Sequence, residues 1–171
     1  AENYKESFNN QLDDDVVYIG KHRLTDKIFL GDEEISIGEL LLSPTRTYAP
    51  VLRNLLQHRF EKIHGLVHCS GGGQTKCMKY LPGNFRIVKD NLFEPPIIFD
   101  IIQQNSGSSP KEMYEVFNMG CRLEIFCDPG DAMEMIETAA SFDIPAQITG
   151  RVEASDKKQL IIKTGNEEIL Y

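Results

Sequence analysis

Three consecutive glycines directly after an apolar run constrain this chain more than any other feature. Residues 63–69 read Ile-His-Gly-Leu-Val-His-Cys, and apolar side chains at odd and even positions predict a strand buried on both faces. Ser70-Gly71-Gly72-Gly73 ends this run, and residues 74–81 are predicted to form a short helix that Pro82-Gly83 stops. Glycines between a strand and a helix favour either a tight turn or a phosphate site built from backbone amides and the helix dipole. From the residues alone both interpretations stay open.

A helix is predicted to begin at Ser43, a good N-cap, with Pro44 as the first helical residue. Pro50 has no amide hydrogen to donate, so this helix either restarts near Ala49 or kinks there. The apolar residues that follow recur at helical spacing and form one stripe: Tyr48, Val51, Leu52, Leu55 and Leu56.

The second half of the chain alternates between predicted helices and strands. Residues 85–88 and 121–127 read as strands, the latter half-exposed because Cys121, Leu123, Ile125 and Cys127 alternate with Arg122, Glu124 and Phe126. Helices are predicted after Pro95-Pro96, after the capping box that Ser109 forms with Glu112, and after Asp128-Pro129. Residues 146–154 and 159–163 read as a hairpin. This order predicts a mixed α/β fold, with helices packed against a single sheet of parallel and antiparallel strands.

Residues 1–35 are expected to be an irregular acidic segment that covers the domain formed by residues 36–171. Acidic clusters lie at residues 13–15 and 32–34, and a short β-branched and aromatic run at residues 16–20 is the one strand candidate. The chain has no initiator Met, so we expect it to be cut from a longer protein.

The charge balance limits the classes of partner. The sequence has 18 Lys and Arg against 26 Asp and Glu, a net charge of −8, which argues against a duplex-binding or membrane-surface protein because both need a basic footprint. No apolar run approaches the ~20 residues that span a bilayer, and the first residues hold no apolar signal core. We therefore expect a cytoplasmic protein in which Cys69, Cys77, Cys121 and Cys127 are reduced thiols.

Few residues suggest chemistry by their spacing. His64 and His68, four apart on a strand, would stand roughly 13 Å apart, too far to share a metal ion, so no metal site is predicted. His68 adjoins the glycine turn and can act there as a hydrogen-bond donor or acid/base, or it is a core histidine. Thr45, Arg46 and Tyr48 surround a predicted helix start, as an anion site or as a solvated cap. Asn118-Met119-Gly120 reads as a glycine C-cap.

Four segments of the chain form a recognisable set: residues 41–48 (LLSPTRTY), 65–73 (GLVHCSGGG), 112–120 (EMYEVFNMG) and 148–152 (ITGRV). Together they resemble the C-terminal half of the aminoimidazole ribonucleotide synthetase (phosphoribosylformylglycinamidine cyclo-ligase) family. They match its Pro-Thr-Arg-x-Tyr, His-x-Thr-Gly-Gly-Gly and Met-Tyr-x-x-Phe-Asn-x-Gly motifs in order, over about residues 36–156. Ser70 replaces the usual Thr, Arg122 stands where glycine is frequent, and residues 74–80 depart from the family's Glu-Asn and Arg.

The resemblance implies a three-layer α/β domain that closes one wall of a cleft. In the family, ATP activates a formamide oxygen, an amidine nitrogen closes the imidazole ring, and ADP and phosphate leave. It implies catalytic roles for His68 and Asn118, and contacts to substrate or phosphate from Thr45, Arg46, Tyr48, Ser70, Gly71, Gly72, Gly73 and Gly120.

The same resemblance implies that an N-terminal domain, absent here, binds most of the ATP and Mg²⁺. The whole enzyme would be a homodimer acting on a small ribonucleotide, and this chain alone would be inactive and would bind no cofactor. Two alternatives stay open. One is the matching domain of a selenophosphate synthetase, thiamin-phosphate kinase or hydrogenase-maturation protein, and the other is a non-catalytic binding or assembly module.

Overall fold

The computed structural model describes residues 11, 13, 20–44, 46–165 and 167–171. These residues form two compact units along the chain. The smaller unit comprises Ala1–Pro44 and Ile97–Ser108, and the larger comprises Thr45–Pro96 and Ser109–Tyr171. No helix within the described ranges combines the length and the apolar character needed to cross a membrane.

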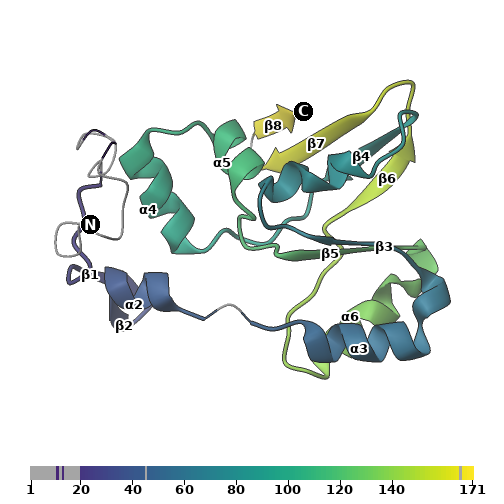
Figure 1. Cartoon of the computed structure of the whole chain (residues 1–171), viewed down its shortest axis with the longest axis horizontal. Helices are drawn as coiled ribbons and strands as arrows, with labels where there is room; N and C mark the ends of the chain where they lie inside the picture. The colour runs from purple at the N-terminus through teal and green to yellow at the C-terminus, as the bar shows by residue number, and fades with distance from the viewer. Residues whose placement is uncertain (1–10, 12, 14–19, 45, 166) are drawn as a thin grey trace. The chain divides into compact units, whose positions relative to one another are not determined.

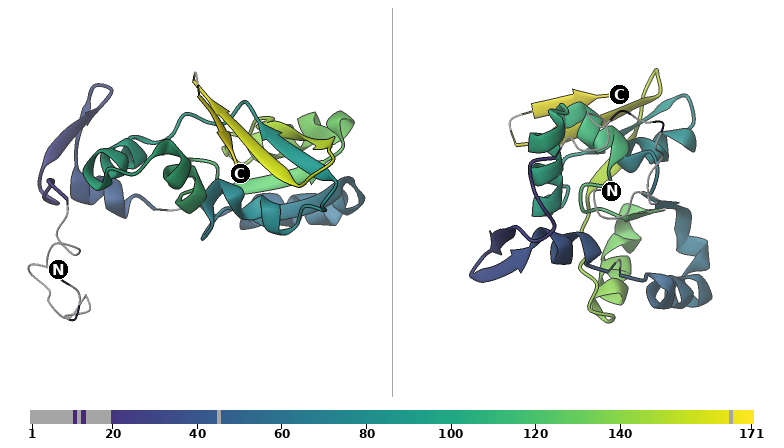
Figure 2. Two further views of the ribbon diagram at one scale, coloured as in Figure 1. Left: turned by 90° about the horizontal axis from the view of Figure 1, so that it is seen from above. Right: turned by 60° about the vertical axis from the view of Figure 1, so that its left-hand side comes forward.

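The smaller unit contains regular structure that the sequence did not predict. Strands β1 (Lys27–Leu30) and β2 (Glu33–Ser36) pair antiparallel, and Gly31 turns the chain between them with φ of 63°. The hairpin leads directly into α2 (Ile37–Leu42), as Figure 2 shows. Ser36 and Glu39 form a capping box at the start of this helix. The strand predicted at residues 16–20 falls outside the described residues except for Gly20.

Helix α4 (Ile97–Ser106) completes the smaller unit and begins directly after Pro95-Pro96, as predicted. The backbone amide of Lys21 donates a hydrogen bond of 2.8 Å to Oδ1 of Asn105. This bond ties the segment before β1 to the last turn of α4.

In the larger unit, helices and strands alternate along the chain (Figure 1). The elements are α3 (Ala49–His58), η2 (Phe60–Lys62), β3 (Ile63–His68), η3 (Gly73–Lys79), β4 (Phe85–Lys89), α5 (Pro110–Val116), β5 (Leu123–Cys127), η4 (Pro129–Asp131), α6 (Ala132–Ala140), β6 (Gly150–Ala154), β7 (Gln159–Thr164) and β8 (Glu167–Leu170).

The helix predicted to start at Ser43 starts at Ala49 instead. Ser43 ends α2, and Pro50 lies in the first turn of α3, where its missing amide costs no hydrogen bond. The alternative of a restart near Ala49 is therefore confirmed. Helices α3 and α6 pack together through Val51, Leu55, Met135 and Ala139, against side chains of the β3–β5 pair.

The mixed α/β class is confirmed, but the single sheet and the C-terminal hairpin are wrong. Among the described residues, β3 and β5 pair only with each other, while a separate four-stranded sheet has the order β6-β4-β7-β8. Strand β4 lies between β6 and β7, antiparallel to the former and parallel to the latter. The connection over residues 155–158 reaches about 14 Å when extended, which suffices to pass two strand spacings of about 4.8 Å each.

Strand β3 is formed as predicted, but it is not buried on both faces. Of its residues only Val67 is buried, while His64, Leu66 and His68 are exposed. A strand in a two-stranded ladder has a free edge, so its side chains are less covered than those of a central strand.

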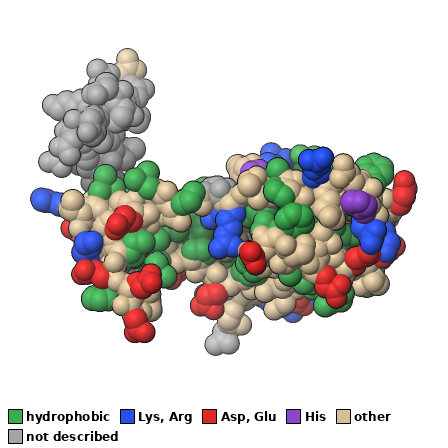
Figure 3. Space-filling view, turned by 90° about the horizontal axis from the view of Figure 1, so that it is seen from below, with side chains coloured by type: hydrophobic (Ala, Val, Ile, Leu, Met, Phe, Trp, Pro, Cys, Tyr) green, Lys and Arg blue, Asp and Glu red, His purple; other side chains and the backbone are tan. Residues whose placement is uncertain are grey.

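On the face drawn in Figure 3, the described acidic and basic side chains are interspersed.

Candidate functional site

The glycine loop, residues 70–73, folds back on the end of β3. The amide of Ser70 donates to the carbonyl oxygen of His68 at 2.8 Å, and that of Gly73 donates to the carbonyl of Ser70 at 3.0 Å. Gly72 and Gly73 have φ angles of 93° and 48°, in the left-handed region that favours glycine. The predicted short helix follows as η3, which begins at Gly73 and is a 3₁₀-helix.

Gly73 also lets the loop touch the end of α5. A Cβ atom at this position would lie 2.7 Å from the carbonyl oxygen of Tyr114 and 2.8 Å from the amide nitrogen of Phe117. Both neighbours are backbone atoms, which cannot move aside as a flexible side chain would. The tight-turn interpretation is therefore correct for Gly73.

Gly71 and Gly72, which precede Gly73 in the loop, keep the features of an anion site. Within the described residues, the amides of Gly71 and Gly72 have no hydrogen-bond acceptor. Next to them, Nζ of Lys76 donates to Oγ of Ser70 at 2.7 Å. Two unpaired amides beside an ammonium group can together bind an oxyanion such as phosphate.

His68 lies at the end of β3 with an exposed side chain. It pairs with Leu123, and Leu66 pairs with Ile125, a residue that packs against α3 and α6. Since paired residues share a face and alternate residues return to it, His68 is on the α3 side. Helix α3 and β3 run in opposite directions, so the start of α3 lies toward the same end as His68 (Figure 1).

The segment before α3 is not itself helical. Nη1 of Arg46 donates to the carbonyl oxygen of Asp143 at 3.0 Å, which ties the segment to the chain after α6. Oγ1 of Thr47 accepts from the amide of Ala49 at 3.3 Å, and Tyr48 is half-buried at the N-cap. Thr45 lies outside the described residues.

Asn118 and Gly120 form a separate turn, and the predicted glycine C-cap is wrong. Helix α5 ends at Val116 with Phe117 as its C-cap. Oδ1 of Asn118 then accepts from the amide of Gly120 at 2.9 Å. Gly120 has φ of 98°, and a Cβ atom there would lie 3.0 Å from Cδ of Pro96, so this position requires glycine.

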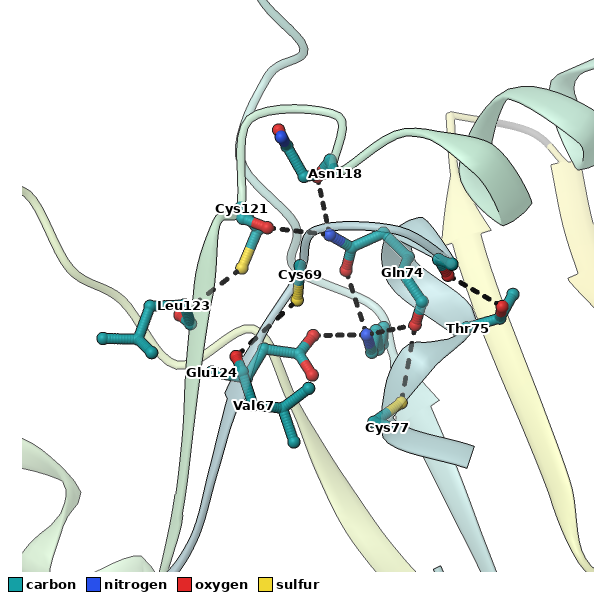
Figure 4. A network of polar contacts seen from close by, with 11 residues as sticks. Val67, Cys69, Gln74, Thr75, Cys77, Asn118, Cys121, Leu123 and Glu124 are labelled. Atoms are coloured by element: carbon teal, nitrogen blue, oxygen red, sulfur yellow. Dashed lines mark hydrogen bonds and ion pairs between the residues drawn. The ribbon is translucent and has the colours of Figure 1, made fainter. Parts of the chain in front are cut away.

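A buried polar network behind the loop was missed by the sequence reasoning (Figure 4). Gln74, Lys89 and Glu124 have relative exposures of 0%, 1% and 7%. Lys89 forms a buried ion pair with Glu124. Alternation along residues 121–127 predicted Glu124 on an exposed face, which is wrong because Lys89 of β4 faces it there. No local signal marks a partner 35 residues away in sequence.

The pKa values of Lys89 and of the nearby thiols are all raised, for different physical reasons. Burial tends to lower the pKa of Lys89, but attraction to Glu124 and their hydrogen bond outweigh it, so the pKa is raised. Burial also raises the pKa of Cys69 and Cys77, and that of Cys121 to about 11. A thiol with a raised pKa is a poor nucleophile at neutral pH.

Across the described ranges, no three or more His, Cys, Asp or Glu side chains are grouped so that they could hold a metal ion.

Comparison with known proteins decides the family. Residues 18–163 match the family model described as AIR synthase related protein, C-terminal domain. The chain belongs to this family. It is 35% identical over 134 residues to a phosphoribosylformylglycinamidine cyclo-ligase from Methanocaldococcus jannaschii, covering 78% of this chain and 37% of the relative.

Other relatives carry the same name. The protein from Pseudothermotoga lettingae is 31% identical over 148 residues, covering 85% of this chain and 42% of the relative. The protein from Methanopyrus kandleri is 34% identical over 119 residues, covering 69% of this chain and 33% of the relative. The chain thus spans between a third and slightly over two fifths of the length of these relatives.

Proposed function

We propose that this chain is the C-terminal portion of a phosphoribosylformylglycinamidine cyclo-ligase and that its glycine loop binds a phosphate group of the substrate or of a nucleotide. The names of the relatives support the reaction. The observation that carries the binding role is the pair of unpaired amides at Gly71 and Gly72 beside the ammonium group of Lys76.

In this proposal the chain positions the ribonucleotide. The loop amides and Lys76 fix the phosphate, and the exposed imidazole of His68 contacts the amide or amidine group. Arg46 and Tyr48 lie just before α3, a helix that packs on the same face of the β3–β5 pair as His68, and in this proposal they contact the substrate from there. The turn of Asn118 and Gly120 is attached to the end of the loop through Gln74, which donates to the Asn118 carbonyl. Fixed dipoles and charges of this kind supply much of the rate in phosphoryl transfer without covalent chemistry.

The remaining parts of the reaction belong to protein outside this chain. In the whole enzyme, ATP and magnesium would be bound by the portion that corresponds to the part of the relatives outside the match to this chain. The proposal also includes a homodimeric, cytoplasmic whole enzyme.

The binding role is tested by titrating the chain with inorganic phosphate and with AMP in a calorimeter. Lys76→Gln should weaken phosphate binding about tenfold, since one charge-assisted contact is worth roughly 1.5 kcal/mol. The matched control is Lys79→Gln, which removes an exposed lysine from the same 3₁₀-helix and should leave the affinity unchanged. Equal effects of both variants would mean that Lys76 acts only through the net charge of the chain. The absence of phosphate binding by the wild type would refute the proposal.

A further inference from the structure

Gln74 is the first residue after the glycine loop, and its side chain is entirely buried. Its amide nitrogen Nε2 donates to the carbonyl oxygen of Asn118 at 2.6 Å and to that of Cys121 at 3.0 Å. These two carbonyls stand at the two ends of the turn that contains Gly120. The amide of Cys121 closes this turn by donating to the carbonyl of Asn118 at 3.0 Å, and the Gln74 side chain bridges both ends and attaches the turn to the loop.

Lys89 fixes which way the Gln74 amide points. Nζ of Lys89 donates to Oε1 of Gln74 at 2.9 Å and to its backbone carbonyl at 2.8 Å. With Oε1 engaged as an acceptor, Nε2 must face the turn. Lys89 of β4 is held in turn by its ion pair with Glu124 of β5, so two strands of different sheets anchor the amide.

We infer that Gln74 is a positioning residue that sets the glycine loop and the Asn118 turn in one fixed geometry. The inference rests on the function proposed above, because both segments carry residues proposed to contact substrate. Hydrogen bonds weaken steeply as their angle departs from linear. A small rotation of the loop would therefore misdirect the amides of Gly71 and Gly72 from a bound oxyanion.

Two substitutions separate the donor role of Gln74 from its bulk. Gln74→Met keeps most of the volume and removes both polar atoms. Gln74→Glu keeps an acceptor for Lys89 but replaces the donor with an oxygen that faces the carbonyls of Asn118 and Cys121. Both variants should weaken phosphate binding at least tenfold. They should also shift the amide resonances of Gly71, Gly72 and Gly120 in the ligand-free protein.

The control for a purely structural effect is Leu55→Ala, which removes buried atoms from the core between α3 and α6. It should lower stability and leave both the phosphate affinity and those amide resonances as in the wild type. Phosphate affinity of Gln74→Glu within twofold of the wild type would overturn the inference, as would a loss no larger than that of Leu55→Ala.

The ligand-free spectra keep this result apart from failure of the proposed function. If the wild type binds no phosphate, the proposed function fails, and the coupling of loop to turn is judged from the shifts alone. Unchanged resonances of Gly71, Gly72 and Gly120 in both Gln74 variants would then overturn the positioning role. Changed resonances would support a positioning role for a ligand other than phosphate.

Discussion

Replacing Gly73 by alanine should destabilise the larger unit strongly. The position has φ of 48°, and a residue with a Cβ atom in this region costs about 1–2 kcal/mol. The added Cβ would also meet backbone atoms of Tyr114 and Phe117 at 2.7 and 2.8 Å. Overpacking of this kind costs about 1–3 kcal/mol, so the free energy of unfolding should fall by roughly 2–5 kcal/mol.

The neighbouring glycines provide graded controls in urea denaturation followed by circular dichroism. A Cβ at Gly71 would meet nothing within 4 Å, so Gly71→Ala should change the free energy of unfolding by less than about 0.5 kcal/mol. At Gly72, φ of 93° with the nearest atom at 3.7 Å leaves backbone strain alone, or about 1–2 kcal/mol. Gly73→Ala with the stability of Gly71→Ala would refute the close approach of the loop to α5.

The other predictions concern the buried network and the charged surface. Lys89→Met leaves Glu124 buried without its partner and should lower the free energy of unfolding, measured by urea denaturation, by about 3–5 kcal/mol. The double variant Lys89→Met/Glu124→Leu should recover most of this loss. A double variant as unstable as the single one would contradict the ion pair. Iodoacetamide in native buffer should alkylate the half-buried Cys127 well before the buried Cys121, whose pKa is raised to about 11. Mass spectrometry over time measures the order of alkylation. The reverse order would show that the buried network opens readily. Hydrogen bonds from Lys62 and Arg59 lower the pKa of Glu134, so its contribution to stability is present above its ordinary pKa of 4.5 and is lost as the pH falls through the lowered value. In a plot of the free energy of unfolding against pH, Glu134→Gln should therefore reduce the fall on the acid side. An unchanged acid side would exclude a contribution of Glu134 to stability.

The sequence predicted those features whose cause is local. The Ser109–Glu112 capping box and the start of α4 after two prolines are confirmed, because each depends on residues within one helical turn. The glycine loop was found for the same reason, since the positive φ angles at Gly72 and Gly73 favour glycine at those positions themselves.

Features that depend on distant partners could not be predicted. Strands β6 and β7 looked like a hairpin because they are close in sequence, but β4 pairs with both of them. Glu124 carried the polar signature of an exposed position, and its burial follows from Lys89 on another strand. Gln74 read as an ordinary first residue of a helix, and only the structure shows that it joins two segments of the candidate site.

The binding of phosphate by the glycine loop is tested most directly by recording amide resonances of the chain during a phosphate titration. We expect saturable shifts at Gly71 and Gly72, whose amides have no acceptor in the part of the chain that the structure describes, and a much smaller change at Gly73, whose amide already donates to the Ser70 carbonyl. Shifts confined to other parts of the chain, or no saturable shift at Gly71 and Gly72, would contradict phosphate binding by the loop.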